Sequence, residues 1–364
     1  MTYESYIEID LEAIKHNAQS IQKRIDSAKM MAVLKADAYG HGLKQVGKAL
    51  ISSGILYFAV ASLYEALILR ELSEDIQILI FGNVHPDSLV TVKEKNLLLS
   101  LSSKEQVSCI KEKKISGLNV FLKLNTGFNR MGFDNMETEK ETICEFAKEN
   151  VIKGIYSHLA LGKLEEDKTQ YQFFQEFISD LKEMGIEAPL HSLAESIATV
   201  DYPWSRMDMV RVGAALFGLR TARKSYDTFD LKGALRFYAS VSNVREIKKG
   251  AGVGYDMLFK APKDMKIAVI SVGYADGYPR ALSEKGWLLI QGKKCNILGL
   301  ICMDSLIVDI SHLENVKLND KVLVFESAND SLVSIQELST IAGTNKNEML
   351  ARLTASRVPK VYTN

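Results

Sequence analysis

Short apolar runs, many rich in β-branched residues, recur through the first half of the chain and alternate with amphipathic segments. Segments such as Leu11–Ile21, Lys44–Ile51, Leu63–Leu72 and Gln170–Met184 repeat apolar residues about every 3.6 positions, which predicts helices. The runs expected to be strands are Met30–Leu34, Tyr57–Val60, Ile76–Phe81, Leu97–Leu101, Asn119–Leu124, Ile152–His158, Pro189–Leu193 and Met209–Val212. Strands and helices in this alternation predict an α/β fold of the TIM-like (β/α)₈ barrel type, with a doubly wound sheet as the alternative.

The second half has a different sequence pattern: strand-like runs follow one another closely, with turn residues between them. These runs are Tyr238–Ile247, Met265–Ser271, Trp287–Gln291, Cys295–Leu300, Leu306–Ile310 and Lys321–Phe325. A capping box from Ser334 to Glu337 opens one helix, which we expect to end near Ala342 before Gly343. We therefore predict a barrel domain over residues 1–230 and a mostly β C-terminal domain over residues 231–364.

A length of 364 residues favours two domains over one hydrophobic core. The 45 basic and 45 acidic residues balance, so the chain has no net field to attract nucleic acid or an anionic membrane. We expect a small-molecule partner.

The cysteines and the N-terminus bear on location. Cys109, Cys144, Cys295 and Cys302 lie far apart, without the spacing of a metal site or the density of a disulfide framework. The N-terminus lacks a signal-peptide pattern, and no apolar run is long enough to span a membrane. We predict no metal site, reduced thiols and a cytoplasmic protein, or the cytoplasmic part of a longer membrane-anchored one.

Lys35 follows the first predicted strand directly, within the string Lys35-Ala36-Asp37-Ala38-Tyr39-Gly40-His41-Gly42. Barrel enzymes build their sites at the C-terminal ends of the strands, and a desolvated lysine there can form an imine with an aldehyde. A solvated lysine before a turn is the alternative.

Other polar residues lie at the ends of later barrel strands. They are Lys123, Asn125, Arg130, His158, Ser196, Arg211 and Gly213. Each alone fits a salt bridge, a core histidine or a turn, but their convergence on one barrel face favours a site. In the second half, Tyr255 and Tyr274 lie among glycines and could be acid/base groups or turn aromatics, and Cys302-Met303-Asp304 could be core or a loop that meets a partner.

These blocks together resemble the bacterial alanine racemases. The string Ala32–Gly42 is similar to their cofactor-lysine signature. The similarity continues to the end of the chain through Asn125-Thr126-Gly127, Asp208-Met209-Val210-Arg211, Val272-Gly273-Tyr274-Ala275-Asp276-Gly277, Cys302-Met303-Asp304 and Arg357-Val358-Pro359.

The resemblance implies that pyridoxal 5′-phosphate is the cofactor and that Lys35 carries it. Tyr39, Ser196 and Gly213 would hold its phosphate. Arg211, kept in place by His158, would lie against the pyridine nitrogen. An always-protonated arginine there disfavours ring protonation, which favours return of the proton to Cα over transamination.

The resemblance also implies a head-to-tail homodimer that shares its active sites. Racemisation needs one base on each face of the substrate. Lys35 would serve the D-isomer and Tyr255 of the other subunit the L-isomer. Arg280 and Tyr274 would support and line the site, with Cys302 and Asp304 beside them. Arg130 and the backbone of Met303 would receive the substrate carboxylate.

Two positions depart from the family pattern. Asn125 replaces a common aspartate, which leaves open the carbamylated-lysine role sometimes assigned to the position of Lys123. Asn347 replaces a tyrosine that helps to hold the phosphate, and it leaves more room and an amide beside the substrate side chain. The same change is associated with the serine racemases of vancomycin resistance, whose catalytic portion the chain resembles.

We therefore expect a serine racemase that also accepts alanine and supplies D-amino acids for cell-wall precursors. An alanine racemase in which Asn347 is incidental is the nearest alternative. A non-catalytic carrier of the cofactor would not need Tyr255. A decarboxylase on the same scaffold is disfavoured by Arg211.

Overall fold

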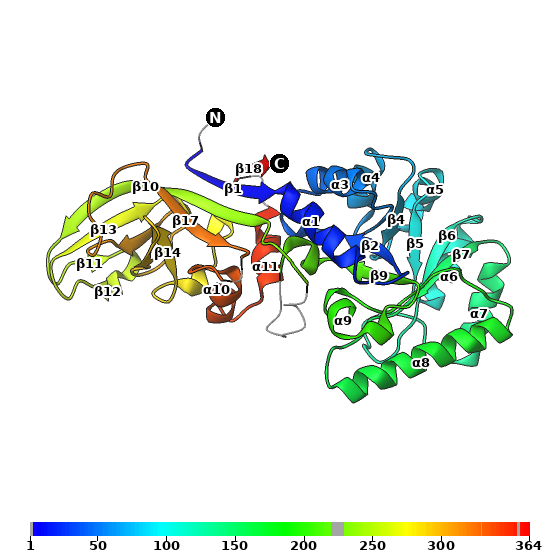
Figure 1. Ribbon diagram of the computed structural model, residues 1–364. Helices are drawn as coiled ribbons and strands as arrows, with labels where there is room; N and C mark the ends of the chain where they lie inside the picture. Colours follow the sequence, from blue (N-terminus) through cyan, green and yellow to red (C-terminus); the bar gives the residue numbers. More distant parts are fainter. Residues whose placement is uncertain (1–2, 220–228, 329, 355–356) are drawn as a thin grey trace.

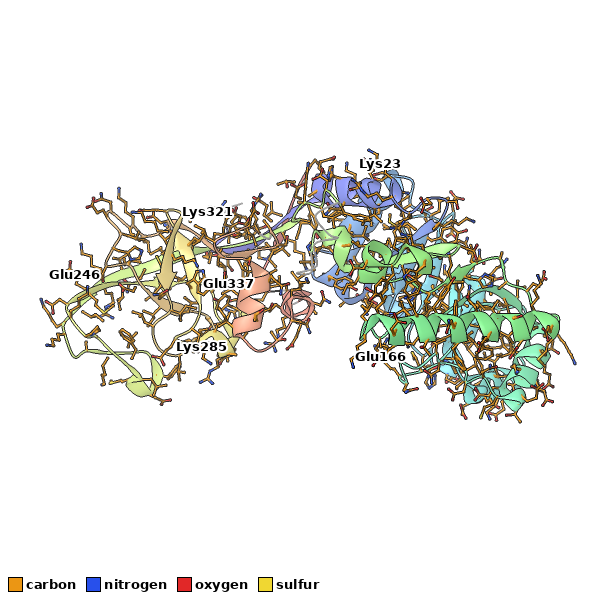
Figure 2. All side chains as sticks on the ribbon, turned by 60° about the horizontal axis from the view of Figure 1, so that its bottom comes forward. Lys23, Glu166, Glu246, Lys285, Lys321 and Glu337 are labelled. Atoms are coloured by element: carbon orange, nitrogen blue, oxygen red, sulfur yellow. The ribbon has the colours of Figure 1, made fainter. Side chains whose placement is uncertain are left out.

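The chain folds into two parts, a barrel and a mostly β body, that lie beside each other along the long axis of the molecule (Figure 1). The computed structural model describes residues 3–219, 229–328, 330–354 and 357–364. The predicted barrel and the predicted β domain are confirmed. Charged side chains of both signs lie on both parts, with Lys23 and Glu166 on the barrel and Glu246 and Lys285 on the β body (Figure 2).

Eight parallel strands form the barrel, in the spatial order β8-β7-β6-β5-β4-β3-β2-β9. Their bounds are β2 Lys29–Val33, β3 Tyr57–Val60, β4 Gln77–Ile80, β5 Leu98–Leu101, β6 Asn119–Lys123, β7 Val151–Tyr156, β8 His191–Ser192 and β9 Met209–Val212. A parallel bridge between Glu195 and Arg211, with Arg211 N–H donating to the Ala194 carbonyl at 3.0 Å, brings the β8 side against β9. This contact nearly closes the sheet into a barrel.

Helices cover the outside of the barrel. They are α1 Leu11–Gln22, α3 Leu43–Ser52, α4 Leu63–Arg70, α5 Leu89–Glu94, α6 Lys104–Glu112, α7 Glu137–Ala147, α8 Leu164–Glu183 and α9 Ser196–Asp201, with short 3₁₀ turns η1 Pro86–Ser88, η2 Pro203–Ser205 and η3 Ala214–Phe217. Side chains cap several of them: Asp10 accepts from the Ala13 N–H at the start of α1, and Ser62 accepts from the Glu65 N–H at the start of α4.

The barrel interior is filled by side chains that point inward from alternate strand positions. This inner core consists of Met31, Val33, Ala59, Leu79, Leu98, Phe121, Tyr156, Leu190 and Met209. Burying each large apolar side chain stabilises the fold by about 1.5–3 kcal/mol. Gly154 makes room for Phe121, because a Cβ at this glycine would lie 2.3 Å from the Phe121 ring. The middle of the barrel is therefore a packed core.

The β body is built on one long strand, β10, which pairs with β1, β13 and β17. The sheet has the order β15-β14-β17-β10-β1-β18, and β16 pairs with β13. The bounds are β1 Ser5–Asp10, β10 Leu235–Ile247, β11 Gly252–Val253, β12 Phe259–Lys260, β13 Met265–Ile270, β14 Trp287–Ile290, β15 Lys293–Asn296, β16 Leu306–Asp309, β17 Lys321–Glu326 and β18 Lys360–Thr363.

Two helices and several 3₁₀ turns complete this body: α10 Ile335–Ile341, α11 Lys346–Ala351, η5 Tyr255–Met257, η6 Tyr274–Asp276, η7 Arg280–Leu282 and η8 Arg352–Thr354. As predicted, Ser334 caps α10 by accepting from the Glu337 N–H, and Gly343 follows with φ 71°. α11 lies where the two parts meet (Figure 1).

The strand predicted over Cys295–Leu300 begins and ends earlier, at Lys293 and Asn296. Gln291 and Gly292 both have positive φ, so they form a two-residue hairpin turn that places Lys293 directly opposite Ile290. Gly299, at φ 64°, then turns the chain away. The hairpin geometry, rather than the apolar run, sets the register.

β1 and β18 were not predicted, because each is short and its partners are distant in sequence. β1 pairs antiparallel with β10 and parallel with β18, so the first strand belongs to the C-terminal sheet. The domain limits of residues 1–230 and 231–364 stay a prediction. Within the described ranges no helix is both long and apolar enough to cross a membrane.

Candidate active site

A cavity of about 470 Å³ lies at the C-terminal ends of the barrel strands, as the strand-end residues predict. Its lining includes Val33, Lys35, Tyr39, Phe81, Lys123, Arg130, Met131, Tyr156, His158, Glu195, Ser196, Ile197, Arg211, Gly213, Leu219, Lys346 and Asn347. The structure thus brings together nine of the predicted site residues, although they are far apart in the sequence. They are Lys35, Tyr39, Lys123, Arg130, His158, Ser196, Arg211, Gly213 and Asn347.

Lys35 follows β2 and extends into this cavity. Burial and the positive charge of Arg130 lower the pKa of its amine, while Glu65 opposes the shift. A lower pKa leaves a larger fraction of the amine neutral, and the neutral amine is the form that attacks an aldehyde.

A second lysine, Lys123, lies in the same cavity and has a pKa lowered to about 7 by burial and by Arg211 and Arg130. Its Nζ donates to the Leu124 carbonyl at 2.7 Å and to Ser157 Oγ at 3.3 Å. These bonds hold the Lys123 amine against the barrel wall. Geometry therefore favours Lys35 as the amine that meets the cofactor, although the pKa of Lys123 is also low.

The segment after Lys35 is a left-handed turn. Ala36, Asp37, Ala38 and Tyr39 all have φ between 52° and 54°. Each such residue costs about 1–2 kcal/mol relative to the right-handed form. Lys35 and Tyr39, four residues apart, both line the cavity across this turn.

His41 restrains this turn from inside the protein. Its Nδ1 donates to the Tyr39 carbonyl at 2.9 Å and to the Ala38 carbonyl at 3.1 Å, and its ring stacks on Phe217 at 4.1 Å. Full burial lowers the pKa of His41 to about 4, so the ring is neutral at physiological pH. In the sequence, His41 stands out only as part of the string that contains Lys35.

Tyr39, Ser196 and Gly213 form a small cradle at one side of the cavity. Gly213 N–H donates to Ser196 Oγ at 2.9 Å, and a Cβ at Gly213 would lie 2.5 Å from the Tyr39 hydroxyl. Only glycine allows this approach. Burial, with the nearby Glu195, raises the pKa of Tyr39 to about 12, so its hydroxyl keeps its proton and can donate.

Arg211 is fully enclosed in the barrel wall. Its Nη1 donates to the Ser192 carbonyl at 2.8 Å and to Ser192 Oγ at 2.7 Å, and its Nη2 donates to the carbonyls of Ser157 and Leu193. Burial lowers its pKa to about 10, which leaves it charged at neutral pH. Four hydrogen bonds fix the guanidinium in one orientation.

His158, predicted to keep Arg211 in place, makes no hydrogen bond to it among the described residues. The His158 ring packs edge-on against Phe128 at 5.1 Å. Burial and the cations Arg211, Lys123, Arg130 and Lys35 lower its pKa to about 3. It is a neutral ring among positive charges.

Asn125 does not line the cavity; its side-chain amide donates to Asn129 and Asp134 and shapes the loop that carries Arg130. The Arg130 guanidinium lies over the Phe128 ring at 4.5 Å.

Basic residues outnumber acidic ones in the lining of the cavity. The acidic residue is Glu195, and the basic ones are Lys35, Lys123, Arg130, Arg211 and Lys346. This balance suits a ligand that carries both a phosphate and a carboxylate.

These residues fit pyridoxal phosphate. Lys35 offers an amine, the Tyr39–Ser196–Gly213 cradle offers donors for a phosphate, and Arg211, two residues before Gly213, offers a fixed cation in the same cavity. When bound, the cofactor withdraws electrons from the substrate Cα and makes its proton acidic.

The site residues predicted in the second half lie elsewhere. Tyr255, Tyr274 and Met303 are 67 %, 41 % and 53 % exposed. Tyr274 N–H donates to the Cys302 carbonyl at 3.1 Å, and Ala275 N–H donates to the Met303 carbonyl at 3.0 Å, so these two loops adjoin. Asp304 pairs with Arg357. Arg280 begins η7 at the surface. We refer to the loops that carry Tyr255, Tyr274 and Met303 as the β-domain face.

Sequence reasoning missed several lining residues. Tyr156 is the inward residue of a predicted strand, and its ring lies 5.4 Å from Lys123 Nζ and 5.1 Å from the Arg211 guanidinium carbon. Strand alternation could have identified it. Lys346 adjoins Asn347, and burial lowers its pKa to about 8. No local signal distinguished Lys346, because its environment is made by α11 meeting the barrel.

Comparisons with known proteins agree with this geometry. Residues 9–221 match the family model described as "Alanine racemase, N-terminal domain" and residues 234–362 match "Alanine racemase, C-terminal domain". The alanine racemases of Desulforamulus reducens and Methanococcus maripaludis are 34 % and 35 % identical over 369 residues, and each alignment covers 98 % of both chains.

Solved structures give the same result. The alanine racemase of Clostridium difficile 630 superimposes with a TM-score of 0.91 at 27 % identity, covering 100 % of this chain and 96 % of the other. The Bacillus anthracis alanine racemase with bound L-Ala-P gives a TM-score of 0.92 at 27 % identity and the same coverage. The chain therefore belongs to the alanine racemase family of pyridoxal-phosphate-dependent racemases.

Proposed function

We propose that the protein interconverts L- and D-serine and accepts alanine as well. The observation that carries this proposal is that Asn347 lines the same cavity as Lys35 and Arg130. An asparagine side chain is short, and it can both donate to and accept from a substrate hydroxyl. A substrate bound between Lys35 and Arg130 would have its side chain within this shared space.

The relatives named above are alanine racemases, so racemisation of alanine is the activity that the family supports directly. Serine differs from alanine by one hydroxyl, which a small pocket without a dedicated polar partner distinguishes by only about 1–3 kcal/mol. Asn347 would be that partner. An alanine racemase with little serine activity is the second candidate.

For the reaction itself, we propose two bases. Lys35 would move the proton on one face of Cα and Tyr255 of a second copy the proton on the other. Arg130 and the Met303 backbone of that copy would receive the substrate carboxylate. Arg211 stays charged, and its two Nη atoms are held by the protein, so it would hold the cofactor ring in a fixed orientation without giving up a proton.

A second copy is part of the proposal because the barrel cavity and the β-domain face are separate within one chain. Tyr255 is 67 % exposed and does not line the cavity. A head-to-tail homodimer would place the β-domain face of each copy over the barrel cavity of the other, with Arg280 and Tyr274 beside Tyr255. Cys302 and Asp304 would support the Met303 loop.

The cellular role follows as part of the same proposal. A serine and alanine racemase would supply D-amino acids for cell-wall precursors in the cytoplasm, and D-serine would serve precursors of the vancomycin-resistant kind. Among the described residues this chain has no membrane-spanning helix.

Steady-state kinetics with chiral product analysis test the proposal. Purified protein loaded with pyridoxal phosphate is assayed with L-serine and L-alanine over a range of concentrations. We expect kcat/KM for the two substrates to agree within about tenfold. A value for serine below about one hundredth of that for alanine would leave the alanine racemase as the better description.

A further inference from the structure

The left-handed turn Ala36–Tyr39 determines how Lys35 and Tyr39 are placed relative to each other. Both residues line the cavity, one at each end of the turn. A run of left-handed residues is unfavourable for L-amino acids, so contacts outside the turn must hold it. His41 and Phe217 supply such contacts from the inner side.

Asp37 supplies the contacts on the outer side. Its Oδ1 accepts from the Leu43 N–H at 2.7 Å, and its Oδ2 accepts from Lys360 Nζ at 2.9 Å. Its own N–H donates to Glu65 Oε1 at 3.3 Å, and the other oxygen of Glu65 accepts from the Ala61 N–H. Two carboxylates therefore face the turn, and Lys360 provides the opposite charge.

Lys360 is placed by the far end of the chain. It begins β18, which runs parallel to β1 with Ile7 opposite Lys360. The Lys360 side chain is 14 % exposed and that of Asp37 is 34 % exposed, so the ammonium is largely shielded from water and the carboxylate is partly shielded. Shielded pairs of this kind are stronger than fully exposed ones.

Tyr362 adds a second contact from the same strand. A Cβ at Gly42 would lie 1.9 Å from the Tyr362 hydroxyl, so the phenol occupies the space beside this glycine. Burial and the charge of Asp37 raise the pKa of Tyr362 to about 12. The strand that ends the chain thus packs directly on the segment that follows the cofactor lysine.

We propose that the Asp37–Lys360 ion pair is a positioning device for the cofactor: it holds the left-handed turn so that Lys35 and Tyr39 contact the two ends of pyridoxal phosphate together. Neither Asp37 nor Lys360 lines the cavity, so both act through the turn. The proposal depends on the cofactor of the family and not on which amino acid is the substrate.

The test compares Lys360→Met, which keeps the stem and loses the charge, with Lys360→Arg, which keeps the charge. Lys140→Met is the matched control, because Lys140 pairs with Asp180 at 3.0 Å between α7 and α8 and the two side chains are 12 % and 38 % exposed. The dissociation constant of pyridoxal phosphate is measured by titrating each apoprotein. Denaturant unfolding of the apoprotein is measured in parallel.

We expect the dissociation constant to rise about tenfold in Lys360→Met and to stay within about twofold in Lys360→Arg and in Lys140→Met. Circular dichroism at the absorption band of the bound cofactor, scaled to the amount bound, should fall in Lys360→Met only, since it reports the fixed orientation of the cofactor. A merely structural role would lower the unfolding midpoint without changing this signal.

A double-mutant cycle tests whether Asp37 and Lys360 act as a pair. Asp37→Asn keeps the acceptor for Leu43 and removes the charge, and it serves as the test if Lys360→Met does not fold. If the two residues act together, the double variant binds the cofactor about as weakly as either single variant. Independent, multiplicative losses, or unchanged cofactor affinity in both single variants, would overturn the proposal.

Discussion

The barrel cavity and the β-domain face both carry predicted site residues, but their physical states differ. In the barrel, Arg211 makes four hydrogen bonds, and burial shifts the pKa values of Lys35 and His158 downward. On the β-domain face, Tyr255 and Met303 are more than half exposed. The inner part of the barrel site, with Lys123 and Arg211, is already built and buried within one chain, although Lys35 and Arg130 are still exposed. The β-domain face acquires such an environment only when another surface covers it.

This difference assigns the two regions different tasks. A pre-formed pocket with fixed cations binds and orients a charged cofactor at little cost in reorganisation. In the proposed dimer, a tyrosine in an exposed loop would reach the substrate only after assembly. Cofactor binding should therefore survive damage to the β-domain face, and racemisation should not.

The largest effect is expected on the barrel side, at Lys35. Lys35→Ala should lower kcat/KM by roughly 10³-fold or more, because in the proposed reaction the amine both carries the cofactor and acts as one base. Borohydride reduction of the wild-type protein, followed by mass mapping, should place the cofactor on residue 35.

Lys123 is the stringent control for that result, because its pKa is also low and it lines the same cavity. In Lys123→Met the reduced adduct should remain on Lys35. An adduct on Lys123 in the wild-type protein would contradict the assignment and show that hydrogen bonds to Leu124 and Ser157 do not restrain that amine.

The next largest effect is expected on the β-domain face. Tyr255→Phe should bind the cofactor normally yet lose racemisation in both directions by roughly 10²–10⁴-fold, since each direction of the proposed reaction needs both bases. Exchange of the Cα proton of the D-isomer with deuterated solvent should continue, because Lys35 alone can carry it out. Near-normal racemisation would remove Tyr255 from the reaction.

Mixing Lys35→Ala with Tyr255→Phe protein sharpens this result. In a shared-site dimer, half of the mixed chains pair as hybrids with one intact site, so about a quarter of wild-type activity should return. If each chain completed its own site, the mixture would stay inactive. The measurement requires subunit exchange, which a dilution and reconcentration step allows.

Local pattern predicted the barrel side of the site well, because strand ends in a parallel barrel must converge on one face. Lys35, Arg130 and Arg211 were found in this way. The positions of the barrel strands could also be predicted from local sequence, since each apolar run there marks one strand. The turn after Lys35 was not foreseen as left-handed: a run of four such residues that includes two alanines has no local signal, and tertiary contacts such as those of His41 hold it.

Contacts between distant segments account for the other omissions. β1 and β18 pair across nearly the whole chain, so neither shows a hairpin signal. Lys346 enters the cavity because α11 packs against the barrel, and the ion pair of Asp37 with Lys360 spans 323 positions. Such contacts depend on the finished fold and leave no periodicity in the sequence.

The next effect in size is a loss of stability in acid, which we expect from the buried ring of His41. Folded His41 has a pKa of about 4, whereas an unfolded histidine has about 6.5, so below pH 6.5 the unfolded state binds a proton that the folded state does not. The free energy of unfolding should therefore fall as pH drops from about 6.5 to 4, by about 3 kcal/mol for this group. Urea unfolding at fixed protein concentration, over pH 7 to 4, measures it.

His41→Asn keeps a side-chain N–H for the carbonyls of Ala38 and Tyr39 but cannot titrate, so its stability should fall less steeply with acid. His85, whose side chain is 73 % exposed, is the control, and His85→Asn should keep the wild-type slope. Equal slopes in all three proteins would show that burial of His41 does not oppose its protonation.

The smallest effect concerns substrate choice at Asn347, which comes from α11 of the C-terminal body but lines the barrel cavity and not the β-domain face. Asn347→Tyr should lower kcat/KM for serine about tenfold more than for alanine, which corresponds to about 1.4 kcal/mol for one hydrogen bond and a modest clash. Alanine activity should stay level or rise if the phenol also contacts the phosphate.

Asn347→Ala separates the loss of the hydrogen bond from the loss of space, since it removes the hydrogen bond and adds space. A loss of serine preference in both variants assigns the preference to the amide, and a loss in Asn347→Tyr alone assigns it to volume. An unchanged serine-to-alanine ratio in both would leave an alanine racemase in which Asn347 plays no part in recognition.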